Sequence, residues 1–270
     1  MTPEIDALTA RATLEWLVEM GCDEAIAEHP LNRFALPERM AAPEAPAPLA
    51  PPVTGAPPAP EDPVAAARHA AAGAGSIEAL REALAHYPHC PLRHGTPGLV
   101  FADGRPGARV MVVGDAPDRD DVRAGRPFAG PAGALLDAML AAIGLARDAD
   151  DPRRAAYLVA ALPWRPAGRE AEPSHLAMIE PFLRRHVELA APEVVVLMGN
   201  DACAAALGER GMTRLRGTWA EAFGRPALPI LPPRHLLARP EGKREAWADL
   251  LDLAARLDLP AARPHRKERR

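Results

Sequence analysis

Asp115 and Phe128 are the residues of this 270-residue chain whose types and positions first suggest chemistry. Asp115 directly follows an apolar run, in the turn Gly114–Pro117, and its carboxylate is the one best placed for acid–base or electrostatic work. Phe128 ends a Gly-Arg-Pro-Phe turn, where an aromatic ring on a rigid backbone beside a carboxylate suits stacking on a flat ligand. Two plainer interpretations stay open, namely a solvated helix-capping aspartate and a core-filling phenylalanine.

A basic segment, Arg210–Trp247, is the third feature. It carries eight Arg or Lys residues and three acidic ones, a local net charge of +5, whereas the whole chain has 32 basic and 36 acidic residues and a net charge of −4. This asymmetry favours contact with a polyanion, although an ordinary solvated basic face remains the alternative. His235 is a lone histidine in this segment, and no cluster with metal-ligand spacing accompanies it, so we expect no metal site.

These residues need elements that position them. The apolar run Val110–Val113 predicts a buried parallel strand that ends at the turn carrying Asp115. A charged loop over 118–126 follows, and apolar residues at helical spacing predict a helix over 134–143 that stops at Gly144. The unit is therefore strand, polar loop and helix, and in open α/β sheets such a loop lies where ligands bind.

The same alternation continues along the chain. We expect strands over 99–102, 110–113, 156–161, 194–198 and 227–231, and helices capped by Ser76 and over 134–143, 174–189, 202–207 and 243–257. This order predicts a three-layer α/β/α fold with a central, mostly parallel sheet. The loops 114–117, 163–166 and 231–235 follow strands, so we expect them to converge on one crevice.

Four segments divide the chain. We expect an N-terminal helical segment over 1–36 with a helix over 6–28, a Pro/Ala-rich linker over 37–75, a globular domain over 76–259 and a basic tail over 260–270. Three widely separated cysteines fit a reducing compartment, and no signal peptide or membrane-spanning run is present. The expectation is a cytoplasmic monomer that does not engage a membrane.

Six colinear stretches between Cys90 and Leu257 resemble the uracil-DNA glycosylase superfamily, in particular its family 4-like bacterial branch. They are Leu99–Gly104, Val112–Pro117, Gly125–Gly130 with Gly133 and Leu135–Asp137, Pro163–Pro166, Arg214–Gly217, and Leu236–Pro240 with Lys243–Trp247. The resemblance implies base excision repair, with DNA that contains a damaged base as the partner. Such enzymes flip the target base into a pocket and hydrolyse its N-glycosidic bond.

The resemblance also implies residue roles. Asp115 stands where the family has a water-handling Glu, Phe128 matches the stacking aromatic, and Gly114, Ala116 and Pro127 complete the base-binding turn. Ala160 occupies the position of the Asn that reads the base edge. Pro232 occupies that of the His that supports the leaving oxygen, and His235 lies three residues later. We assign catalysis to Asp115 and His235, so the expected set of catalytic residues departs from the family pattern.

DNA contacts and cofactors follow from the same comparison. The expected DNA contacts are Arg216, Arg234, Leu236, Leu237, Arg239 and Lys243, the two leucines being the wedge for the vacated base stack. Of the family's iron–sulfur ligands only Cys90 is retained, because Tyr87, Trp164 and Ile179 fill the other positions. One thiolate cannot hold a cluster, so we expect no cofactor.

Three hypotheses remain. The first is a glycosylase acting on uracil or another deaminated base, and the second is a catalytically inactive DNA-binding relative, favoured by Ala160 and Pro232. The third is a small-molecule enzyme, against which the lack of a glycine-rich phosphate loop counts. The first two require that the turns carrying Asp115 and Arg234 face each other across a slot roofed by Phe128.

Overall fold

The computed structural model describes residues 62–95, 98–166 and 171–259, together with Arg11, Thr13, Trp16 and Met20. The chain divides into two compact units, Met1–Pro57 and Pro58–Arg270. Arg11, Thr13 and Trp16 are helical, as predicted for 6–28. Met20 lies in a turn, and the other residues of that predicted helix, the linker as far as residue 61 and the tail 260–270 lie outside the described residues.

A six-stranded sheet organises the second unit, in the order β1-β3-β2-β4-β6-β5. The strands are β1 (Ala102–Gly104), β2 (Val110–Gly114), β3 (Ala156–Ala160), β4 (Val194–Met198), β5 (Ala220–Ala222) and β6 (Arg225–Pro229). The four central strands are parallel, and the edge strands β1 and β5 are antiparallel to their neighbours. β2 and β4 are buried at every position, which is why both read as continuous apolar runs.

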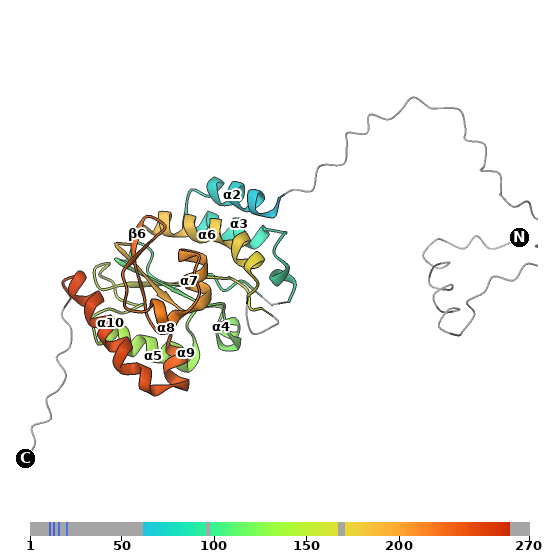
Figure 1. Ribbon diagram of the computed structural model, residues 1–270. Helices are drawn as coiled ribbons and strands as arrows, with labels where there is room; N and C mark the ends of the chain where they lie inside the picture. Colours follow the sequence, from blue (N-terminus) through green and yellow to red (C-terminus); the bar gives the residue numbers. More distant parts are fainter. Residues whose placement is uncertain are drawn as a thin grey trace, which may run out of the picture. The chain divides into compact units, whose positions relative to one another are not determined.

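Helices cover both faces of this sheet. They are α2 (Pro63–Gly73), α3 (Ile77–His86), α4 (Arg119–Ala124), α5 (Gly130–Ala141), α6 (Pro173–Ala190), α7 (Asn200–Leu207), α8 (Met212–Leu215), α9 (Pro233–Ala238) and α10 (Lys243–Arg256), with 3-10 turns η2 (Pro91–Gly95) and η3 (Pro240–Gly242). α2, α3 and α6 lie on one side, and α5, α9 and α10 on the other (Figure 1). The three-layer α/β/α prediction is confirmed. Within the described residues, no helix is both long and apolar enough to cross a membrane.

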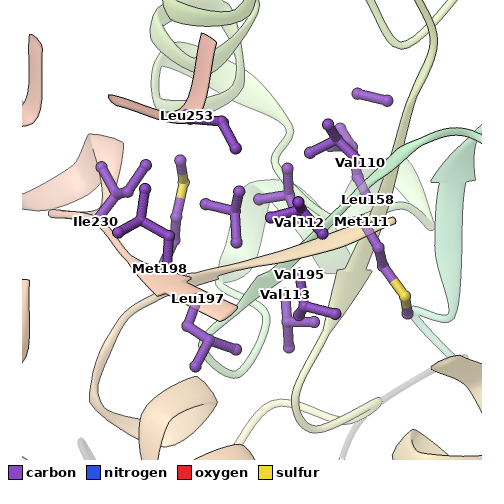
Figure 2. Packing of buried hydrophobic residues seen from close by; sticks show 14 of the residues in the cluster. Val110, Met111, Val112, Val113, Leu158, Val195, Leu197, Met198, Ile230 and Leu253 are labelled. Atoms are coloured by element: carbon purple, nitrogen blue, oxygen red, sulfur yellow. The ribbon is translucent and has the colours of Figure 1, made fainter. Parts of the chain in front are cut away.

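The main core lies between the sheet and its helices. Figure 2 shows Val112 on the side of the sheet that faces Leu253 of α10, where Met198 also lies, and Val113 beside Val195 of the neighbouring strand on the other side. A second apolar cluster joins α2 and α3 to α6 and includes Leu80 and Phe182. These two clusters hold the strand ends, and therefore the loops after them, in fixed positions.

The predicted linker extends too far. Residues 63–73 form α2, whose Ala67 and Ala71 are buried in the second cluster. Asp62 caps this helix by accepting a hydrogen bond from the Val64 N–H, and Pro63 begins it. Alanine is the strongest helix former, so an alanine-rich segment without internal proline becomes a helix once a neighbour covers it.

The polar loop predicted over 118–126 is also wrong, because most of it forms α4. Asp118 and Asp121 make a reciprocal capping box, and Gly125 ends the helix in the left-handed conformation. The loop between the strand and α5 therefore contains its own short helix. Other boundaries move by a few residues: the first strand lies at 102–104, the last parallel strand at 225–229, and α5 begins at Gly130.

Candidate active site

A cavity of about 420 Å³ opens at the carboxyl ends of the parallel strands. Its lining comes from the last residues of β2, β3 and β4 and from the segments after β2, β4 and β6, as expected for a ligand site in an open α/β sheet. All the predicted base-binding residues line it, namely Gly114, Ala116, Pro127, Phe128 and Ala160. Asp115, Arg234 and His235 line it as well, so the predicted meeting of these turns in one slot is confirmed.

Asp115 is held by the start of α7. Its Oδ1 accepts hydrogen bonds from the backbone N–H groups of Asp201 at 2.7 Å and Ala202 at 3.4 Å. The carboxylate lies against Gly199, which has a φ of +130° and where any Cβ would collide with the Asp115 carboxylate. The helix-capping interpretation is therefore correct, but Asp115 is partly buried in the cavity wall rather than solvated.

The environment of Asp115 changes its acidity. Burial, and after it the nearby charge of Asp201, together raise the pKa of its carboxyl from 3.8 to about 6, although the hydrogen bonds from α7 and the charge of Arg234 act in the opposite direction. A carboxyl group with this pKa is mostly ionised at neutral pH. Its pKa is also close enough to neutral pH for the carboxylate to accept a proton. That combination suits a general base.

Phe128 is held in an uncommon backbone conformation with a φ of 54°. Its ring lies over Gly114, where an added Cβ would collide with the ring. Its carbonyl accepts a hydrogen bond of 3.2 Å from the Arg147 Nη2. A left-handed conformation costs a bulky residue of order 1–3 kcal/mol, and such strain is found mainly at functional sites. The half-buried ring packs against the core and also forms a wall of the cavity, so neither a purely core-filling nor a fully exposed interpretation is correct.

Three strand ends form the floor of the cavity. In the ladder Ala160 of β3 pairs with Gly114 of β2, which pairs in turn with Met198 of β4. Ala160 contributes only a methyl group, and Pro232, after β6, contributes no side-chain polar atom. The two positions where the family resemblance implies Asn and His are therefore apolar walls.

Arg234 connects α9 to α4. Its Nη2 donates to Asp118 Oδ2 at 2.9 Å and lies 3.8 Å from Asp121 Oδ2. Asp121 is buried, and its Oδ1 accepts from the Ala129 N–H at 2.7 Å. The acidic ends of the α4 capping box thus fix the cavity-facing arginine. Sequence reasoning missed these partners because it treated 118–126 as an irregular loop, although the capping-box spacing was visible.

The predicted DNA contacts divide into two groups. Three are exposed: Leu237 on α9, Arg239 between α9 and η3, and Lys243 at the start of α10. Leu236 is only 1% exposed and packs in the main core, so its predicted contact with DNA is wrong. Arg216 donates from Nε to Asp249 Oδ2 at 2.9 Å, and Asp249 is buried. Arg216 thereby neutralises a buried carboxylate, which gives it a structural role in place of the predicted phosphate contact.

Asn200 and Thr213 also line the cavity and were not predicted. Asn200 begins α7, and its Oδ1 accepts from the backbone N–H groups of Gly211 at 3.1 Å and Met212 at 3.0 Å. These bonds tie the start of α7 to α8. The sequence signal is a glycine and an asparagine directly after a buried strand, which is weak without knowledge of the neighbouring segment.

The positions of the expected iron–sulfur ligands come together in the second apolar cluster. Tyr87, Cys90, Trp164 and Ile179 are each at most 3% exposed there. Cys90 supplies one thiol, whose pKa is raised by burial, and Tyr87 donates its hydroxyl to the Pro63 carbonyl at 2.6 Å. A phenol, an indole and an alkyl chain are not iron ligands of such clusters, so these residues do not fit one.

The family model of the uracil DNA glycosylase superfamily matches residues 101–251, which contain the whole cavity. A Type-4 uracil-DNA glycosylase of Sulfurisphaera tokodaii is 29% identical over 149 residues, 53% of this chain and 65% of the relative. One of Thermotoga maritima is 27% identical over 165 residues, 60% of this chain and 83% of the relative. One of Archaeoglobus fulgidus is 35% identical over 114 residues, 42% of this chain and 54% of the relative. The chain thus spans less than two thirds of the length of the first and third of these relatives.

Proposed function

Because the chain belongs to the uracil DNA glycosylase superfamily, we propose that it hydrolyses the N-glycosidic bond of a flipped, deaminated base in DNA. The single observation that carries this proposal is the meeting of Asp115 and Phe128 in one cavity. Asp115, a carboxylate with a pKa of about 6, and Phe128, an aromatic residue with a strained backbone, both follow β2 and line the same cavity.

Base flipping supplies the first step. A base inside a duplex is unreachable, and rotating it out costs a few kcal/mol, least for a mismatched base. In the cavity the Phe128 ring provides a rigid face on which the base stacks. Exposed Leu237 fills the gap in the DNA, while Arg239 and Lys243 contact phosphates.

Bond cleavage follows with Asp115 as the base. Cleavage leaves an oxocarbenium-like sugar and an anionic base, so a carboxylate beside the sugar stabilises the transition state. Ionised Asp115 accepts a proton from the attacking water as the C1′–O bond forms and the C1′–N bond breaks. Its other oxygen is already held by α7, which fixes the direction from which the water approaches.

The leaving base requires a donor. Pro232 offers none from its side chain, so the imidazole of His235, the third residue of α9, is assigned to support the departing oxygen. Removal of one such donor typically costs 10²–10³ in rate. A glycosylase slower than its relatives is the expected consequence of this changed set.

A base-release assay on full-length protein tests the function. Oligonucleotides containing uracil, hypoxanthine or xanthine are incubated with the wild type and with Asp115→Asn, and freed base is quantified. Release by the wild type and its loss in the variant support the proposal. No release from any substrate contradicts it.

A second candidate function is favoured by the apolar side chains of Ala160 and Pro232 at the cavity wall. It is a catalytically inactive protein that binds damaged DNA through the same cavity. Salt-dependent DNA binding that weakens in Arg239→Ala, without base release by the wild type, supports this alternative. Base release by the wild type excludes it.

The domain requires no iron–sulfur cluster in this proposal. The apolar packing of Tyr87, Trp164 and Ile179 around Cys90 supports this part of the proposal, because packed side chains can join the same segments that a cluster would join. Metal analysis of the purified protein is the direct measurement.

A further inference from the structure

Among the residues that the structure describes, the cavity wall on the β3 side of the stacking ring carries no polar side chain. The Phe128 ring lies over Gly114, so a base stacked on it has β3 on one flank and β4 on the other. The β3 flank ends in Ala160, which offers a methyl group and no side-chain hydrogen bond. The β4 flank ends at Met198 and continues through Gly199 to Asn200, whose side chain lines the same cavity.

Hydrogen bonds fix the orientation of the Asn200 amide. Two backbone N–H groups, those of Gly211 and Met212, donate to its side chain at 3.1 and 3.0 Å, and only the amide oxygen can accept them. That oxygen has two lone pairs, and both are then used. The remaining polar group is the Nδ2 amino group, for which the described part of the chain provides no acceptor.

The same turn is anchored from its other side. The residues that follow Asn200, Asp201 and Ala202, donate their backbone N–H groups to Asp115. Asn200 therefore lies between a contact to α8 and a contact to the proposed catalytic carboxylate. A residue fixed both by its side-chain oxygen and by the backbone that follows it loses little conformational freedom on binding a ligand, which makes the hydrogen bond from its amino group effective.

We propose that Asn200 selects the base, by donating an Nδ2 hydrogen to a carbonyl oxygen of the flipped base. The inference rests on the proposed function and names the feature that it recognises. Deamination replaces an exocyclic amino donor, as in cytosine or adenine, with a carbonyl acceptor, as in uracil or hypoxanthine. An amide donor pairs with the carbonyl, and faces an unfavourable donor–donor contact with the amino group.

Selection is measured as a ratio of affinities. Full-length protein is titrated with single-stranded oligonucleotides that differ only in one nucleotide, 2′-fluoro-deoxyuridine or 2′-fluoro-deoxycytidine, because the fluorine retards cleavage of the glycosidic bond. The wild type is expected to prefer the uracil oligonucleotide by about 10-fold or more, the size of one hydrogen bond gained and one repulsion avoided. Equal affinity of the wild type for both overturns the inference.

Two variants separate the donor from the fold. Asn200→Asp keeps an oxygen that accepts from Gly211 and Met212 but replaces the donor with an acceptor, and Asn200→Ala removes the donor without adding charge. Both are expected to reduce the uracil preference to about 2-fold or less. The added charge of Asn200→Asp acts equally on both oligonucleotides, because their backbones are the same, and so cancels in the ratio. Retention of the wild-type ratio by either folded variant overturns the inference.

Thr213→Ala is the matched control, because Thr213, like Asn200, lines the cavity and is exposed. It is expected to keep the wild-type ratio. A lost ratio in Thr213→Ala beside a retained one in Asn200→Asp would transfer the role to Thr213 and overturn the inference.

Base release distinguishes failure of this inference from failure of the proposed function. A wild type that prefers uracil in binding but releases no base contradicts the hydrolytic function and leaves the role of Asn200 intact. A wild type that releases uracil, with Asn200 variants that keep both its kcat/KM and its binding ratio, contradicts only the inference.

Discussion

The Asp115 carboxylate accepts a hydrogen bond of 2.7 Å from the backbone N–H of Asp201, which joins the turn after β2 to the first turn of α7. The backbone of α7 thereby orients Asp115, the candidate general base. The Asp115 carboxylate in turn caps the first turn of α7. Substitutions at this junction are expected to change stability and activity together. A matched control variant then separates the two effects.

Gly199→Ala tests the close approach of this junction. An added methyl group would collide with the Asp115 carboxylate, and the φ of +130° at this position disfavours any side chain. We expect base release to fall at least 10²-fold, the usual range for a displaced catalytic group. Gly208→Ala, at the other end of α7 with a φ of +73° and open space around it, should cost about 1–2 kcal/mol of stability and leave base release intact. Equal activity of both variants would show that the contact is dispensable.

Asp115 also predicts a pH dependence of activity. Its pKa of about 6 means that kcat/KM for base release should rise as pH increases through 6 and level off above it, because the ionised form is the base. Asp115→Asn should lose this rise along with about 10²–10⁴ of the rate. A wild-type profile that is flat between pH 4.5 and 7.5 would exclude Asp115 as the general base.

The same shift predicts that Asp115 destabilises the fold at neutral pH. Its pKa is raised on folding, so the folded state favours the protonated form. The associated stability is fully present below pH 3.8 and is lost as pH rises through about 6. Asp115→Asn, which keeps an acceptor for the α7 N–H groups, should therefore be more stable than the wild type at pH 7 by about 1–3 kcal/mol. The difference should shrink toward pH 4, as measured by urea unfolding at both values; a gain that does not depend on pH would contradict this origin.

Leu236 and Leu237 are adjacent residues with opposite environments. Leu236 is 1% exposed and Leu237 is 46% exposed. Leu236→Ala is expected to lower the free energy of unfolding by about 2–5 kcal/mol. Leu237→Ala should change it by less than about 0.5 kcal/mol while weakening the affinity for damaged DNA. Unchanged DNA affinity in Leu237→Ala would remove the wedge from the proposed mechanism.

Arg216 and Arg239 form a second matched pair. Arg216→Ala leaves the buried Asp249 carboxylate without its partner, which should cost about 3–5 kcal/mol of stability. Arg239→Ala should leave stability unchanged, weaken DNA binding and reduce the slope of log affinity against log salt by about 1. A salt slope that changes in folded Arg216→Ala and not in Arg239→Ala would reverse the two assignments.

Packing around Cys90 predicts stability without metal. Incubation of the purified protein with a strong iron chelator should leave its Tm unchanged, and Cys90→Ala should cost only the loss of one small buried side chain. Trp164→Ala should lower the free energy of unfolding by about 3–5 kcal/mol, because the indole is buried in the second apolar cluster. A Tm that falls after chelation would contradict the absence of a cluster.

Much of the fold follows from local patterns in the sequence. The apolar runs that became β2 and β4, with helical periodicity between them, specify a parallel sheet covered on both faces, because a strand buried on both sides leaves no polar alternation. The turn after β2 was likewise identified as the site, since ligands bind at the carboxyl ends of such strands. Asp115 and Phe128 belong to that turn or follow it closely, so local sequence was sufficient to select them.

Only the tertiary structure decided which neighbouring side chains face the cavity. Leu236 and Leu237 are the same residue type in one short helix, and the position of α9 against the core alone buries the first and exposes the second. The orientation of the Asn200 amide is set by hydrogen bonds from the backbone N–H groups of Gly211 and Met212, which belong to a different segment. Such contacts join residues whose partners are set by packing of whole elements, and no local periodicity encodes them.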